Sequence, residues 1–156
     1  MIRRRAACML VLATFLVAGM PVAATALPGW IPVDAAFSPT EISFVDLMNV
    51  DRSSLGLAPM RGDPALVDIA RRHSERMRDA GKVFHNSNLF SEAPGPWSAI
   101  AENVGAGTSV QVVHRKFMRS PQHRENILGG FDRVGVGVAV SASGRVYVTQ
   151  VFVRAG

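Results

Sequence analysis

Apolar side chains recur at helical spacing in two long segments of the chain. The first segment follows Ser38-Pro39-Thr40-Glu41, which has the form of a capping box with proline at the first helical position. The second follows Asp63-Pro64, a similar start signal, and stops at Gly81, a residue typical of helix ends. The spacing therefore predicts helices over about 39–55 and 64–80, with inner faces made by Ile42, Val45, Leu47 and Met48 and by Leu66, Ile69, Ala70, His73 and Met77.

Two shorter helices are predicted further along. The first covers about 109–118, and its His114 is expected to be partly exposed because two basic residues follow it. The second begins at Ser120-Pro121, where Ser120 is expected to cap the helix. Between the long helices and these short ones, residues 86–96 are rich in Ser, Asn, Pro and Gly, which is typical of a loop.

The period changes from helical to alternating in the C-terminal segment. Valines alternate with small residues over 134–140, and a second alternating run over 146–152 follows the turn residues Ser143-Gly144. Two such runs separated by a turn predict an antiparallel hairpin. Helices first and a sheet last predict an α+β domain in layers, and the absence of any internal repeat indicates one domain over 38–156.

Residues 1–26 have the pattern of a signal peptide. Three arginines precede an apolar run over 6–20 that is short for a membrane span, and Ala24-Thr25-Ala26 is a small-x-small cleavage site. Residues 27–37, with two prolines, are expected to form an extended leader. We therefore expect a protein that is secreted or held in the cell envelope, with no membrane contact after cleavage; an uncleaved membrane anchor is the alternative.

Removal of the signal changes the charge and the cysteine count. The whole chain has 17 Lys and Arg against 12 Asp and Glu, but three arginines leave with the signal, so 14 against 12 remain, a net charge of +2. A nucleic-acid partner is not expected at that charge. The single cysteine, Cys8, also leaves. A chain of about 130 residues can still bury one self-supporting core, so a monomer without disulfides is expected.

Three polar residues from separate segments are candidate site residues. His123 lies near the start of its short helix, where the helix dipole disfavours the imidazolium form. His85 follows an apolar pair and enters the loop, and Glu102 is a carboxylate with apolar neighbours. Two histidines and one carboxylate can hold zinc or another divalent cation with one position left open.

The residues alone leave a structural alternative open. In that alternative Glu102 accepts backbone N–H groups and the histidines donate to carbonyls, with no metal involved. His73, on an inner helix face, is expected to be a hydrogen-bonded core histidine. Arg124 either clamps an anionic ligand or braces a neighbouring carboxylate or carbonyl, and Asn126 is expected to fix backbone where the short helix ends.

Taken together, these motifs resemble the CAP superfamily, named for cysteine-rich secretory proteins, antigen 5 and pathogenesis-related 1 proteins. The likeness is greatest to the short, cysteine-free domains that bacteria export. It covers nearly all of the chain from about Phe44, through Met48-Asn49 with Arg52, Gly56-Leu57 and Pro59, Ala70 with His73-Ser74 and Met77, His85, Glu102-Asn103-Val104, Phe117-Met118, Ser120-Pro121, His123-Arg124, Asn126-Ile127-Leu128, Val134-Gly135-Val136-Gly137 and Thr149-Gln150-Val151-Phe152.

The resemblance implies a three-layer α-β-α sandwich with a mainly antiparallel central sheet and a cleft. It implies that His85 and His123 are the metal-binding histidines, and that Glu102 is the glutamate that precedes an asparagine, Asn103. A second acidic position of the family falls near Ser120, where this chain has serine, so the pair of carboxylates is incomplete. Asn103, Ser120, Arg124 and Asn126 are accordingly expected to line the cleft or support it.

Members of the CAP superfamily have diverse activities, so the resemblance leaves three functions open for this chain. The first is an exported binding domain, not an enzyme, with an extracellular lipid or peptide as its unidentified ligand. The second is a metal-dependent hydrolase of peptides or cell-envelope polymers with Glu102 as general base. The third is a lipid or sterol carrier, whose groove Phe90, Trp97 and Ile100 could line unless they simply cover the sheet.

Overall fold

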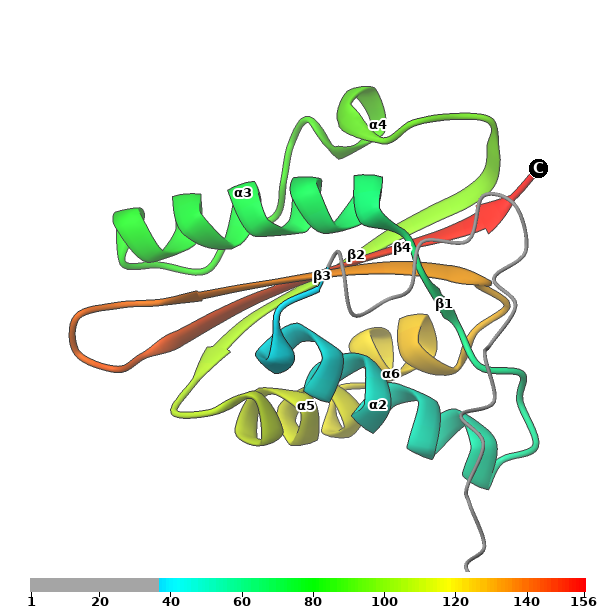
Figure 1. Cartoon of the computed structure of the whole chain (residues 1–156), viewed down its shortest axis with the longest axis horizontal. Coiled ribbons are helices and arrows are strands. Elements are labelled where there is room, and N and C mark those ends of the chain that lie inside the picture. Colours follow the sequence, from blue (N-terminus) through cyan, green and yellow to red (C-terminus); the bar gives the residue numbers. More distant parts are fainter. Residues whose placement is uncertain (1–36) are drawn as a thin grey trace, which may run out of the picture.

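The computed structural model describes residues 37–156 as a four-stranded sheet between two layers of helices (Figure 1). The expected α+β sandwich is therefore confirmed. The predicted signal peptide, and all of the predicted leader except Phe37, lie outside the described residues. The helices are α2 (Pro39–Ser54), α3 (Pro64–Ala80), α4 (Leu89–Glu92), α5 (Val110–Arg119) and α6 (Pro121–Leu128), and the strands are β1 (Arg61–Gly62), β2 (Trp97–Gly107), β3 (Arg133–Val140) and β4 (Val146–Ala155).

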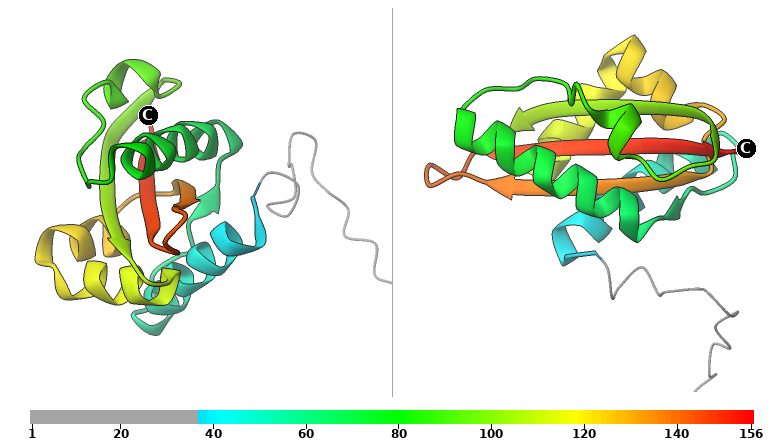
Figure 2. Two further views of the ribbon diagram at one scale, coloured as in Figure 1. Left: turned by 90° about the vertical axis from the view of Figure 1, so that its left-hand side faces the viewer. Right: turned by 90° about the horizontal axis from the view of Figure 1, so that it is seen from above.

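The sheet has the order β1-β3-β4-β2. Strand β1 pairs parallel to β3, whereas β4 pairs antiparallel to both β3 and β2, so the sheet is mainly antiparallel as expected. Helices α3 and α4 cover one face and α2, α5 and α6 the other (Figures 1 and 2). Because β4 is central and covered on both faces, residues 146–153 are all buried. Across residues 37–156, no helix combines the length and the apolar character that a bilayer span requires.

The helix-start and helix-stop signals of the sequence are confirmed at both long helices. Ser38 and Glu41 form the complete capping box at the start of α2. Asp63 caps α3, and Gly81 ends it in the left-handed conformation at φ 65°. These local signals work because each satisfies backbone groups that a helix end leaves without partners.

The strand β2 was not predicted, and the segment before it is not a simple loop. Residues 97–107 contain three alanines and two glycines, which have little strand propensity of their own. The segment is a strand because it pairs along β4 from Gly107 opposite Val146 to Trp97 opposite Ala155. The predicted loop 86–96 contains the short helix α4. Tertiary pairing thus decides the structure where local preference is weak.

Two glycines of β3 let α3 lie directly on the sheet. A Cβ on Gly135 would lie 2.2 Å from the carbonyl carbon of Leu66, and one on Gly137 would lie 2.2 Å from that of Ala70. The alternating partners Val134 and Val136 point to the opposite face, where they are fully buried in the main core. The Val-Gly-Val-Gly repeat therefore has one filled face and one bare face, and the bare face receives the backbone of α3.

An ion pair between a buried carboxylate and a partly exposed arginine joins α2 to α3, which lie on opposite faces of the sheet. Glu41 is 1% exposed and accepts hydrogen bonds from Nε and Nη2 of Arg71 at 2.8 and 2.5 Å. Burial raises the pKa of Glu41, but the hydrogen bonds from Arg71 and Ser38 outweigh it, and the net pKa is lowered. The carboxylate thus stays charged and holds the first turn of α2 to the middle of α3.

We predict that Gly137→Ala lowers the free energy of unfolding by at least about 2 kcal/mol, because overpacking against an unyielding backbone costs about 1–3 kcal/mol or more. Urea denaturation measures the loss. Gly130→Ala is the matched control, because a Cβ there meets its nearest neighbour, Nη1 of Arg154, only at 3.7 Å. Equal stability of the two variants would contradict the close approach of α3 to β3.

Candidate functional site

Glu102 lies in the middle of the edge strand β2 with its side chain turned toward the α3 layer. That side chain is only 5% exposed. Its Oε2 accepts a hydrogen bond from Nδ1 of His85 at 2.7 Å and another from the backbone N–H of Asn86 at 3.0 Å. Its Oε1 is buried and has no hydrogen-bond partner within residues 37–156. The carboxylate therefore fixes both the side chain and the backbone of the segment that carries His85.

The hydrogen bond to Glu102 also determines which nitrogen of His85 is available. A carboxylate oxygen accepts only, so the proton lies on Nδ1 of His85. In the neutral ring Nε2 then keeps its lone pair, and the side chain is 66% exposed. A cavity of about 220 Å³ lies beside this ring, lined by residues of α3 and of the segment 84–88. His85 thus presents an open nitrogen at the rim of a cleft.

His73 supports the same segment from α3. Its ring is fully buried, Nε2 donates to the carbonyl of Phe84 at 2.7 Å, and Nδ1 accepts from Nη2 of Arg76 at 3.2 Å. Its Nε2 also lies 3.9 Å from Oε1 of Glu102. The expectation of a hydrogen-bonded core histidine is therefore confirmed. This residue fixes the chain one position before His85.

His123 approaches from the other helix layer, in the first turn of α6. Its Nδ1 lies 2.8 Å from Oγ of Ser120, and its ring packs on Phe117 with the centroids 4.9 Å apart. Ser120 occupies the N-cap position of α6 as expected, but its hydroxyl forms no capping hydrogen bond to a backbone N–H and contacts this imidazole instead. A proline at the first helical position reduces the need for a cap, which frees the hydroxyl.

The pKa of His123 is lowered from 6.5, first by burial and second by the positive charge of His85. The neutral form is therefore favoured, and the two imidazoles are close enough to influence each other. The unfolded chain binds a proton at this histidine near pH 6.5, whereas the folded chain binds it only at lower pH. The stability that His123 contributes is therefore present above pH 6.5 and is lost as the pH falls through the folded pKa.

Asn103, the residue after Glu102, faces the opposite side of the sheet and holds α6. It is fully buried, and its Nδ2 donates to the carbonyl of His123 and to Oε1 of Gln150, both at 3.0 Å. Nδ2 of Asn126 donates to Oδ1 of Asn103 at 2.8 Å, so Asn126 fixes α6 to β2 and not, as expected, the backbone where the helix ends. Adjacent residues of the edge strand β2 thus hold the segment of His85 from one helix layer and the backbone of His123 from the other.

Arg52 of α2 holds the other end of α6, a role that the residue pattern alone did not indicate. It is 4% exposed, and Nη1 donates to the carbonyls of Ile127 and Gly129 at 2.8 and 2.9 Å. Burial lowers the pKa of its guanidinium. A signal was present in the sequence, because Arg52 continues the inner-face spacing of four after Phe44 and Met48. An arginine on a buried helix stripe indicates carbonyl groups that need a donor.

Several other expected residues do not join the site. The side chain of Arg124 is exposed and forms no hydrogen bond or ion pair within residues 37–156, so it braces no carboxylate there. Trp97 and Ile100 pack against the buried cluster of Leu66 and Ile69, while Phe90 stays 69% exposed. In the described part of the chain, no group of three or more His, Cys, Asp or Glu side chains is arranged to hold a metal ion.

The chain matches the model of the cysteine-rich secretory protein family, CAP, over residues 45–152. It is 30% identical over 118 residues to the uncharacterized protein YkwD of Bacillus subtilis, covering 70% of this chain and 46% of that protein. The chain thus spans about half the length of this curated relative.

Solved structures show the same fold. An extracellular SCP-domain protein of Bacillus anthracis has a TM-score of 0.64 and 29% identity, over 74% of this chain and 40% of that one. An outer surface protein of Borrelia burgdorferi has a TM-score of 0.67 and 14% identity, over 81% of this chain and 97% of that one.

We predict that His85→Gln raises the pKa of His123 toward 6.5 without reaching it, because burial, the larger cause of the shift, remains. Titration of the ring protons by NMR measures this pKa directly. Arg72→Gln removes an exposed charge of α3 as the control and should leave the pKa of His123 unchanged. No response to His85→Gln would mean that the two imidazoles do not share a cleft.

Proposed function

Because the chain belongs to the cysteine-rich secretory protein (CAP) family, we propose that it is an exported binding domain whose cleft holds a divalent cation, zinc foremost, between His85 and His123. Export is supported by the signal-like residues 1–26 and by relatives described as extracellular or outer-surface proteins. The observation that carries the metal proposal is the 2.7 Å hydrogen bond from His85 to the buried carboxylate of Glu102.

A carboxylate that receives the Nδ1 proton of a histidine is the usual outer partner of a metal-binding imidazole. It fixes the ring and leaves Nε2 free to bind. Glu102 meets this description because it is buried and also receives the backbone N–H of Asn86, so it cannot swing away from His85. In this arrangement Glu102 orients the ligand His85 and is not itself a ligand.

His123 fits the second ligand position. A metal ligand must be the neutral imidazole, and the lowered pKa of His123 favours that form. When Nδ1–H donates to Oγ of Ser120, 2.8 Å away, Nε2 is left for the cation. Ser120 then orients the ring of His123 as Glu102 orients the ring of His85, but through a neutral hydroxyl oxygen instead of a charged carboxylate oxygen.

The donor set favours binding over catalysis. Two histidines without a third protein ligand among residues 37–156 leave most positions of a cation to solvent or to an incoming ligand. A hydrolase would need Glu102 to take a proton from an attacking water. One oxygen of Glu102 is already occupied by two donors, and the other is buried. A peptide or lipid group that completes the coordination of the cation is the ligand class that this site would take.

We predict that the wild-type protein binds Zn²⁺, that His85→Ala or His123→Ala weakens binding by at least about tenfold, and that the double variant loses it. Isothermal titration with the metal alone measures the affinity. His114→Gln is the control, since His114 bonds Asp51 at 2.7 Å outside the cleft and glutamine can replace that donor. Unchanged affinity in the double variant would refute the site.

We predict that Glu102→Gln weakens zinc binding by about 10–100-fold, because the charge behind His85 is lost while the shape of the side chain is kept. Glu125→Gln is the matched control, since Glu125 is an exposed carboxylate two residues from His123. Equal affinity in Glu102→Gln and the wild type would contradict the supporting role. Chelator-sensitive cleavage of peptides or glycans by the wild type, lost in Glu102→Gln, would instead favour the hydrolase.

A further inference from the structure

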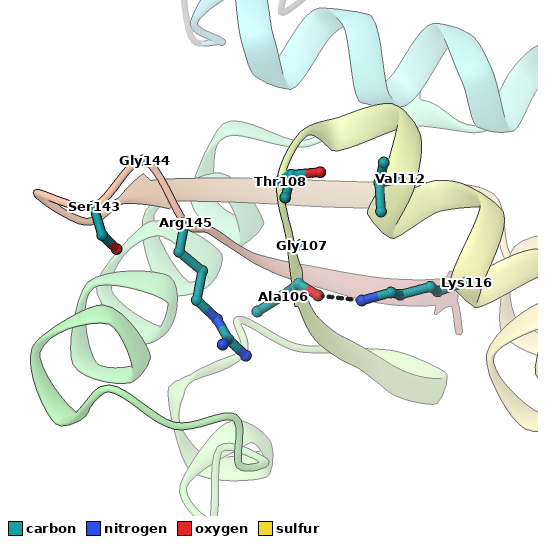
Figure 3. A pocket seen from close by; sticks show the side chains of 8 residues that line it. All are labelled: Ala106, Gly107, Thr108, Val112, Lys116, Ser143, Gly144 and Arg145. Atoms are coloured by element: carbon teal, nitrogen blue, oxygen red, sulfur yellow. Dashed lines mark hydrogen bonds between the residues drawn. The ribbon is translucent and has the colours of Figure 1, made fainter.

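A second cavity lies at the far end of β2, outside the histidine cleft. It has a volume of about 350 Å³ and is bounded by the end of the strand, by one side of α5 and by the turn between β3 and β4 (Figure 3). The cavity shares no lining residue with the one beside His85. Its strand residue Gly107 stands five positions after Glu102, which corresponds to about 17 Å along an extended strand.

Two cationic side chains enter this cavity from opposite sides. Lys116 comes from α5 and Arg145 from the β3–β4 turn, and both reach toward the strand at Ala106 (Figure 3). The lining contains no Asp or Glu to neutralise them. Two positive groups that face one space without a carboxylate are a favourable place for an anion.

The donors of these two cations are largely unused. Nζ of Lys116 donates one hydrogen bond, to the carbonyl of Ala106 at 2.9 Å, which fixes the ammonium group at the cavity and leaves two N–H groups. The guanidinium of Arg145 lies over the ring of Tyr147, 5.4 Å from its centroid, and makes no hydrogen bond or ion pair in the described part of the chain. An aromatic ring beneath it restrains the guanidinium without consuming a donor.

The remaining lining suits an organic group attached to the anion. Val112 and Gly107 supply apolar surface, and Thr108 and Ser143 supply hydroxyl groups at the rim (Figure 3). The volume lies within the range of small-molecule sites. We propose that this cavity binds a small organic anion, with a carboxylate or phosphate between Lys116 and Arg145 and an apolar part against Val112.

Phenyl phosphate and benzoate serve as probes, with neutral benzyl alcohol as the comparison ligand. NMR titration of the wild-type protein should give saturable shifts at the amides of Gly107, Thr108 and Gly144 for both anions and none for the alcohol. Lys116→Gln and Arg145→Gln should each weaken binding of the anions by about tenfold or more, since each removes a charged hydrogen-bond donor. Added salt should also weaken the binding of both anions.

Arg115→Gln is the matched control, because it removes the same charge from the same helix outside the cavity and should change affinity less than about twofold. Binding should also persist in the double variant His85→Ala, His123→Ala, which separates this site from the proposed metal site. Arg145 is exposed at the turn, so its variant tests the proposal even if Lys116→Gln fails to fold. No saturable binding by the wild type, equal loss in Arg115→Gln, or equal binding of benzyl alcohol would overturn the proposal.

Discussion

The structure depends on the close contact between α3 and the face of β3 that carries no side chains. The backbone of α3 rests on the bare face of β3 because Gly135 and Gly137 have no Cβ. This contact sets the height of α3 above the sheet, and α3 carries His73, which fixes the chain just before His85. The position of an exposed histidine at the cleft is thus determined by two buried glycines that lie far from it in sequence. Close packing transmits this constraint because the interior of a protein has little room to adjust.

One dipeptide of β2, Glu102-Asn103, holds both sides of the histidine cleft. Glu102 and Asn103 point to opposite faces of β2, as adjacent residues of a strand must. One fixes the segment of His85 and the other fixes the backbone of His123. A shift of β2 by one residue along β4 would exchange these roles and bury the wrong group in each layer. The buried amides of Asn103 and Gln150, which face each other across the strands, define the correct register.

The sequence correctly predicted the elements that have recognisable start and stop residues or a strict alternation of apolar residues. Capping groups located α2 and α3, and strict alternation located the hairpin. Strand β2 escaped prediction because its small residues form a strand only through pairing with β4. His114 was expected to be partly exposed but is only 5% exposed, because it packs against Phe44 and bonds Asp51. His85 and Glu102 were expected in one site from their residue types, but their direct hydrogen bond was not predicted. The contact between Ser120 and His123 likewise depends on helix geometry that residue type alone does not indicate.

Arg52 has a consequence for how the chain can reach its folded state. Its hydrogen bonds connect α2 to carbonyls 75 to 79 residues away, a span over which exported domains often use a covalent cross-link. The only cysteine of the chain is Cys8, so that cross-link is replaced here by a cation among carbonyls. Hydrogen bonds of this kind form without an oxidant. Residues 37–156 contain no cysteine, so their fold contains no bond that depends on the redox state of the surroundings or on an enzyme that forms disulfides.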